Sequence, residues 1–190
     1  MAPQKLTTPI TASRVTYKTT TSFAVVESRL VSSIRRPSGV QAWPEITKQI
    51  GRTPSEKPAF ISGVEQVVGP HGFMEFYSVD HGAWLPIYAP PTSVSKVDGR
   101  ALKCKRFILG NPLIAITMLE HDLNAGLFVP VELLIAEDEY SKEGEGCRVM
   151  YMLPSGLVAG YEGASKELID AARKLDAKLD ILVQDVTREG

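Results

Sequence analysis

An acid and a histidine stand side by side at Asp80-His81, ahead of Gly82. Imidazole titrates near neutral pH, so a positioned histidine can transfer a proton or hold a ligand. Because neighbouring residues of a strand face opposite sides of a sheet, Asp80 and His81 can act together only if they lie in a turn. The following Gly82 favours such a turn. We take His81 as a candidate acid-base, oriented by Asp80 or Tyr77. A hydrogen-bonded structural pair is the alternative.

A second pair, His121-Asp122, ends a predicted helix. A histidine near a helix C-terminus is favoured by the macrodipole and can bond the last carbonyls, which is one interpretation of His121. The other is that His121 faces His81 across a pocket and supplies a second ligand-binding group. The third histidine, His71, is expected on a loop surface.

Several chemistries find no support in the spacing of residues. The histidines and acids form no HxH or HExxH pattern, and no phosphate-binding glycine loop occurs. Ser155 is not in a Gly-x-Ser-x-Gly turn. Cys104 and Cys147 match no zinc or thioredoxin spacing and are expected as reduced thiols. We therefore predict no metal and no cofactor, and a lyase, isomerase or cyclase step in preference to hydrolysis.

Aromatic residues gather in the middle of the chain. Most such residues are core, but a sheet under a long helix often leaves an apolar pocket with a few polar groups at its mouth. This pattern predicts a small hydrophobic or aromatic ligand. The expected lining or rim residues are Tyr77, Asp80, His81, Trp84, Asn111 and Tyr151, with His121 as a further ligand-binding candidate.

The bulk properties fit one globular domain. The chain has 190 residues, 44% hydrophobic and 23% charged, with a net charge of −1. This charge balance lacks the excess of positive charge that is typical of proteins binding nucleic acid or membrane surfaces. No apolar run approaches the length of a membrane span. The N-terminus has no apolar signal core, so a cytoplasmic location is expected. Residues 1–12 are expected to be flexible, with 13–190 as one domain carrying irregular insertions near 36–72 and 84–100.

Hydrophobic periodicity predicts the elements that position these residues. Alternation and β-branched residues indicate strands at 13–21, 73–79, 101–109, 127–138 and 147–153. Apolar residues at helical spacing indicate helices at 23–36 and 165–186, with shorter ones at 44–50 and 113–122. Residues 51–63 and 154–163 read as loops. Pro130 favours an edge position or a bulge for its strand. The order predicts an α+β fold, one mostly antiparallel sheet covered on one face by helices.

Gly110-Asn111-Pro112 joins a strand to a helix. Gly110 permits a backbone conformation closed to other residues, Asn111 suits an N-cap, and Pro112 suits the first helical turn. Turn chemistry thus explains the motif without a function. The N–H groups at the start of the helix can also receive a ligand oxygen.

The stretch from Phe107 to Leu153 resembles the family called domain of unknown function 302. The segments "ILGNPLIAITMLEHD", "GLFVPVELLIAEDE" and "CRVMYMLPSG" carry the resemblance, and "SVDHG" looks like an Asp-His step of many members. The resemblance implies a TATA-binding-protein-like β-α-β4-α fold and little about activity. Many bacterial members carry Cys at the positions of Gly110 and Val131. This chain has neither, so a thiol or soft-metal role is not expected.

Two functions remain open at this point. In the first, a cofactor-free enzyme or carrier holds a small hydrophobic compound and His81 moves a proton. Whether catalysis occurs is left open. In the second, the chain is a non-catalytic homodimeric interaction or ligand-carrier domain, because the apolar strand "LFVPVELLI" would need covering if it lay at a sheet edge.

Overall fold

The computed structural model describes residues 3–34, 43, 46 and 53–189. Its centre is one five-stranded sheet in the order β1-β5-β4-β3-β2, and every neighbouring pair is antiparallel. The strands are β1 (Arg14–Thr19), β2 (Met74–Asp80), β3 (Cys104–Gly110), β4 (Val131–Glu137) and β5 (Cys147–Met152). The predicted α+β class and its antiparallel sheet are confirmed.

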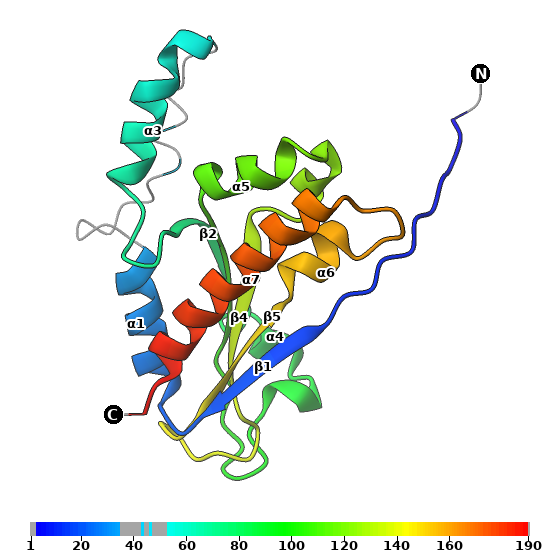
Figure 1. The fold of residues 1–190 in the computed structure, drawn as a ribbon. Coiled ribbons are helices and arrows are strands. Elements are labelled where there is room, and N and C mark those ends of the chain that lie inside the picture. The colour runs from blue at the N-terminus through cyan, green and yellow to red at the C-terminus, as the bar shows by residue number, and fades with distance from the viewer. Residues whose placement is uncertain (1–2, 35–42, 44–45, 47–52, 190) are drawn as a thin grey trace.

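Two helices cover one face of this sheet, α1 (Phe23–Ile34) and α7 (Lys166–Thr187), and in Figure 1 α1 and the lower part of α7 lie to the left of the strands. Each begins directly after a residue type that suits an N-cap, Ser22 for α1 and Ser165 for α7. The Ser165 hydroxyl oxygen accepts a hydrogen bond from the backbone N–H of Leu168 at 3.2 Å. The apolar stripe of α7 is buried against the sheet, including Leu175, Leu179 and Leu182. Amphipathic periodicity therefore placed the helical layer correctly.

The shorter helices lie around the ends of the strands. They are α3 (Lys57–Glu65), α4 (Leu85–Tyr88), α5 (Pro112–Leu119) and α6 (Pro154–Ala159), with 3-10 turns at Pro54–Glu56, Pro91–Ser93 and Leu123–Leu127. Without these additions the order is the expected strand, helix, four strands and helix. Among the described residues, no helix is long and apolar enough to cross a membrane.

Two segments expected as loops are helical. Residues 57–65 form α3, and 154–159 form α6. In each helix a proline occupies the first turn, where its missing N–H costs nothing, so these prolines start helices instead of breaking them. Val64 of α3 is fully buried, in a cluster with Val67 and Met74. The helix expected at 44–50 lies outside the described residues, except for Ile46, which is buried.

The strand that carries the central apolar run is not at an edge. β4 pairs with β3 on one side and with β5 on the other, so it is the middle strand of the sheet. Pro130 comes immediately before β4 and takes no part in its ladder. The expectation of an edge strand or a bulge at Pro130 is therefore wrong. A proline just ahead of a strand leaves the hydrogen bonds of a central strand intact.

Candidate functional site

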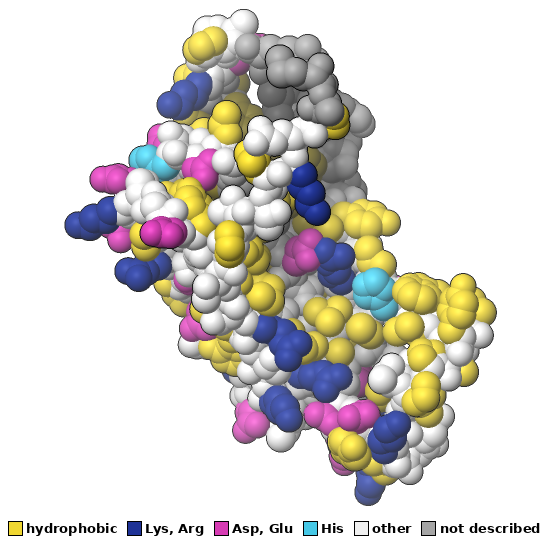
Figure 2. Space-filling view, turned by 90° about the vertical axis from the view of Figure 1, so that its right-hand side faces the viewer, with side chains coloured by type: hydrophobic (Ala, Val, Ile, Leu, Met, Phe, Trp, Pro, Cys, Tyr) yellow, Lys and Arg dark blue, Asp and Glu magenta, His cyan; other side chains and the backbone are white. Residues whose placement is uncertain are grey.

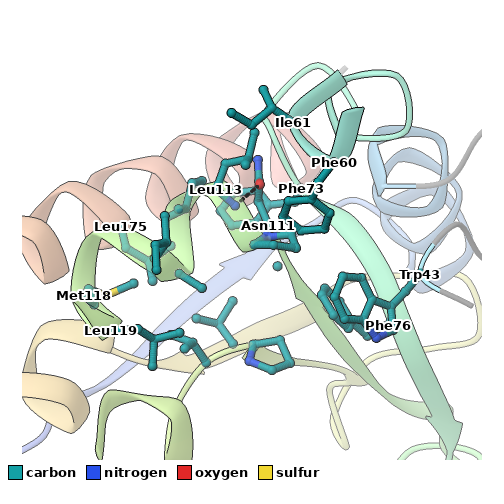
Figure 3. Close-up of a pocket in the computed structure, with 18 of the residues that line it drawn as sticks. Trp43, Phe60, Ile61, Phe73, Phe76, Asn111, Leu113, Met118, Leu119 and Leu175 are labelled. Atoms are coloured by element: carbon teal, nitrogen blue, oxygen red, sulfur yellow. Dashed lines mark hydrogen bonds between the residues drawn. The ribbon is translucent and has the colours of Figure 1, made fainter. Parts of the chain in front are cut away.

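A cavity of about 820 Å³ lies where the Gly110-Asn111-Pro112 turn leaves the sheet. Figure 3 shows Met118, Leu119 and Leu175 on one side of it and Trp43 with Phe76 on the other. Phe60 and Ile61 from α3, Leu113 from α5 and Phe73 ahead of β2 complete most of the apolar wall. Apart from Asn111 and the indole N–H of Trp43, Lys57 is the only lining side chain that carries a polar group among the described residues.

Asn111 fixes the entrance of α5 through both ends of its amide. Its Oδ1 accepts a hydrogen bond from the backbone N–H of Leu113 at 2.8 Å, which makes it the N-cap of the helix as expected. Its Nδ2 donates to the carbonyl oxygen of Gly72 at 2.9 Å. Asn111 therefore ties α5 to the loop that leads into β2. Its Oδ1 keeps a second lone pair with which a ligand can be recognised.

Gly110 is needed because a side chain would not fit at this position, and not because the backbone adopts a conformation reserved for glycine. The described residues with a positive φ do not include Gly110, so the expected special conformation is wrong. A Cβ placed there would lie 3.0 Å from the Pro130 Cβ and 3.3 Å from Phe76 Cε2. The missing side chain lets the segment before β4 pack against β3 at the cavity wall.

An aromatic pair forms one end of the cavity. The rings of Trp43 and Phe76 lie with their centroids 4.7 Å apart and their planes tilted by 39°. Phe76 lies at an irregularity in the β2–β3 ladder, where the pairing shifts between Glu75 and Tyr77. This shift allows Phe76 to line the cavity, whereas Tyr77 is 57% exposed.

The predicted acid-base group is elsewhere. The Asp80 Oδ1 accepts a hydrogen bond from the backbone N–H of Ala83 at 3.1 Å, so the expected turn exists. No hydrogen bond joins Asp80 to His81 within the described part of the chain. The His81 ring instead lies edge-on to that of Trp84, with centroids 5.7 Å apart, and His81 lines a second, smaller cavity.

The last two candidates also fall outside the large cavity. The Tyr151 hydroxyl donates to Asp180 Oδ1 at 3.0 Å, and the Tyr17 hydroxyl donates to the same oxygen at 2.5 Å. Burial raises the pKa of Tyr151, with the hydrogen bond to Asp180 adding to the effect. Tyr151 lines the second cavity. The His121 Nε2 is 3.8 Å from a carboxylate oxygen of Glu120, and His121 lines neither of these cavities.

Comparisons with known proteins agree with this architecture. The family model described as "Domain of unknown function DUF302" matches residues 52–183. The chain belongs to the DUF302 family. A solved structure described as an uncharacterized conserved protein DUF302 from Bacillus stearothermophilus is similar to it, with a TM-score of 0.55 and 16% sequence identity. The similarity covers 92% of this chain and 98% of that one, and at this identity it shows the fold alone. No match was found among curated proteins.

In this DUF302 domain, the cavity residues that sequence reasoning missed come mainly from α3. Phe60 and Ile61 lie in a stretch taken for a loop because of its prolines. A signal was available, because Thr53 and Glu56 form a capping box ahead of α3. Leu175, on the predicted apolar stripe of α7, also reaches the cavity.

The DUF302 chain brings no metal site together in its described residues. No group of three or more His, Cys, Asp or Glu side chains lies close enough there to hold an ion. Burial raises the pKa of both thiols, that of Cys147 to about 11. The large cavity is thus built for apolar contact with few polar groups at its boundary.

Proposed function

We propose that this DUF302 protein binds a small hydrophobic or aromatic compound in the cavity beside Asn111. The main support for this proposal is the size of the cavity. Its volume of about 820 Å³ falls within the range of about 300–1,000 Å³ found for small-molecule sites. Aliphatic and aromatic side chains make up nearly all of its described lining. Moving an apolar compound from water onto such a surface is favourable in proportion to the area removed from water.

Two polar groups, those of Asn111 and Lys57, suggest how such a compound would be oriented. The fixed Asn111 amide offers a lone pair to a hydroxyl donor. The Lys57 ammonium group attracts a carbonyl, phenolate or carboxylate oxygen. We therefore expect one oxygen-bearing end and an aromatic or aliphatic body that reaches Trp43 and Phe76.

Binding has more support than catalysis by His81. The large cavity holds no carboxylate or histidine among its described lining residues, and His81 lines the second cavity instead. The geometry thus favours a ligand-binding or carrier role. We do not propose a homodimer, because β4 is the central strand and needs no second copy to cover its edges.

Tryptophan fluorescence offers a direct test, because the chain has two tryptophans and only Trp43 lines the large cavity. In Trp84→Phe protein, Trp43 is the only remaining tryptophan. We expect naphthol-like aromatic compounds to change its emission and to raise the melting temperature. Ligand at one hundred times its Kd adds about 2.7 kcal/mol of stability. For a chain of this size that corresponds to roughly 5–11 °C.

A filled-cavity variant separates this site from unspecific binding. Ala115 of α5 lines the cavity, and Ala115→Phe is expected to abolish the shift. Thr117 is exposed on the same helix and outside the lining, so Thr117→Phe is the matched control and should keep it. The proposal fails if a broad panel of apolar compounds leaves Trp43 unchanged, or if binding survives in Ala115→Phe.

A further inference from the structure

A second cavity, of about 450 Å³, lies on the sheet face opposite α1 and α7. Leu133, Ile135 and Val149 belong to the core beneath the helices, so the alternating residues Leu134 and Met150 point the other way. Figure 2 shows a hollowed face with hydrophobic side chains in it and with Lys, Arg and His side chains at its borders. Pro130 and Val131 line both cavities, so this segment separates them.

The floor of this second cavity is apolar and crosses the sheet. Leu134 pairs with Met150 on β5 and with Arg106 on β3. Met152 and Phe128 extend the apolar lining toward the end where β5 leaves the sheet. The cavity therefore offers a strip that suits an aliphatic chain.

Cationic side chains stand at both sides of that strip. Arg14 of β1 and Arg106 of β3 both line the cavity, three strand spacings apart and two residues apart in register, so their Cα atoms are roughly 16 Å from one another across the sheet. Arg14 pairs with Met152 and Arg106 lies in the register row of Met150, so the two guanidinium groups flank this part of the strip. Arg148 lies two residues before Met150, and its buried Nε has no hydrogen-bond partner.

The acidic groups near the strip are already engaged. Glu132 forms an ion pair with Arg106. Asp80 accepts the backbone hydrogen bond of Ala83 in its turn and is not among the residues that line this cavity. Within the described residues, Arg14 forms no ion pair. A cationic excess thus collects on this face although the whole chain has a net charge of −1.

We propose that the second cavity binds an amphiphilic organic anion, an aliphatic chain that ends in a carboxylate. The chain would lie on Leu134, Met150 and Met152. The carboxylate would sit between Arg14 and Arg106, since Arg106 keeps donors beyond those used by Glu132 and a guanidinium pairs well with a carboxylate. This inference does not depend on the function proposed for the larger cavity.

The test uses the other tryptophan. Trp84 packs against His81, which lines the second cavity, so Trp84 is the reporter in Trp43→Phe protein. We expect decanoate to change its emission saturably and decanol, with the same chain length and no charge, to bind at least about fivefold more weakly. Arg14→Gln should weaken decanoate binding roughly tenfold or more, because it removes a charge-assisted contact.

The matched control is Lys18→Gln. Lys18 is exposed on the same strand and the same face as Arg14 but does not line the cavity, so its loss should change affinity less than about twofold. Decanol binding as tightly as decanoate would overturn the proposal, as would an unchanged affinity in Arg14→Gln. A decanoate signal seen only at Trp43 would assign the anion to the larger cavity and refute this site.

Discussion

Substitutions of Asn111 should separate the two contributions that its side-chain amide makes to the free energy of unfolding. The Oδ1 atom caps α5, and the Nδ2 atom holds the carbonyl of Gly72 in the loop before β2. Asn111→Ala deletes both bonds. Asn111→Ser keeps a good N-cap oxygen, but the shorter side chain cannot reach Gly72.

The expected sizes follow from these two bonds. Loss of an N-cap costs about 1 kcal/mol, and loss of a side-chain hydrogen bond to a partly buried carbonyl costs about 1 kcal/mol more. We therefore expect Asn111→Ala to lower the free energy of unfolding by about 2 kcal/mol and Asn111→Ser by about 1 kcal/mol. For a chain of this size the first value corresponds to a melting temperature roughly 4–8 °C lower.

Urea denaturation monitored by circular dichroism measures both values. Asn124→Ala is the control, because Asn124 is exposed and its amide bonds only the neighbouring Asp122. It should change stability by less than about 0.5 kcal/mol. If Asn111→Ser is as unstable as Asn111→Ala, the cap contributes nothing. If Asn111→Ala matches the control, the reasoning is refuted for both bonds.

Three further changes test the packing around the sheet. Arg100→Ala should lower the free energy of unfolding, measured by urea titration, by about 3–5 kcal/mol, because it removes the ion-pair partner of the 3%-exposed Glu137, whose Oε2 lies 2.6 Å from Arg100 Nη1. A loss below about 1 kcal/mol would contradict this. Tyr151→Phe should cost about 1.5–3 kcal/mol, since it removes a hydrogen bond to the Asp180 carboxylate, and a wild-type melting temperature would disprove that contribution. Burial raises the pKa of the Cys147 thiol from 9.0 to about 11, so the stability that this thiol contributes is complete well below pH 9 and falls as the pH rises through 9 to 11. Cys147→Ala should therefore lose about 2 kcal/mol less stability than wild type between pH 9 and pH 11, and parallel stability curves would show that the thiol does not titrate as stated.

Local patterns predicted most of the fold because they reflect local physics. The apolar stripe of α7 and the Asn111 cap depend on residues within one or two helical turns. The alternation in β5 likewise records which side chains face the core. Errors arose where one residue type has two roles, as with the prolines that start α3 and α6 and were taken for loop signals.

The position of Pro130 shows a different limit. Its effect on a ladder depends on whether it lies inside a strand or one residue before it, and boundaries are what periodicity defines least well. Here the strand begins at Val131, and Pro130 lies at the wall between the two cavities. The sequence showed that the segment is apolar, but its place at the centre of the sheet depends on long-range pairing with β3 and β5.

Asn111 and His81 lie at different cavities because of the way in which β2 pairs with β3, and this pairing cannot be predicted from local sequence patterns. The pairing of β2 with β3 skips one residue between Glu75 and Tyr77. Because side chains alternate along a strand, one extra residue reverses which face the later side chains take. Phe76 thereby turns to the large cavity, Tyr77 turns to solvent, and His81, the first residue after β2, lies at the smaller cavity. Aromatic residues that are neighbours in sequence are thus divided between two sites, and a ligand at one site would not contact the imidazole at the other.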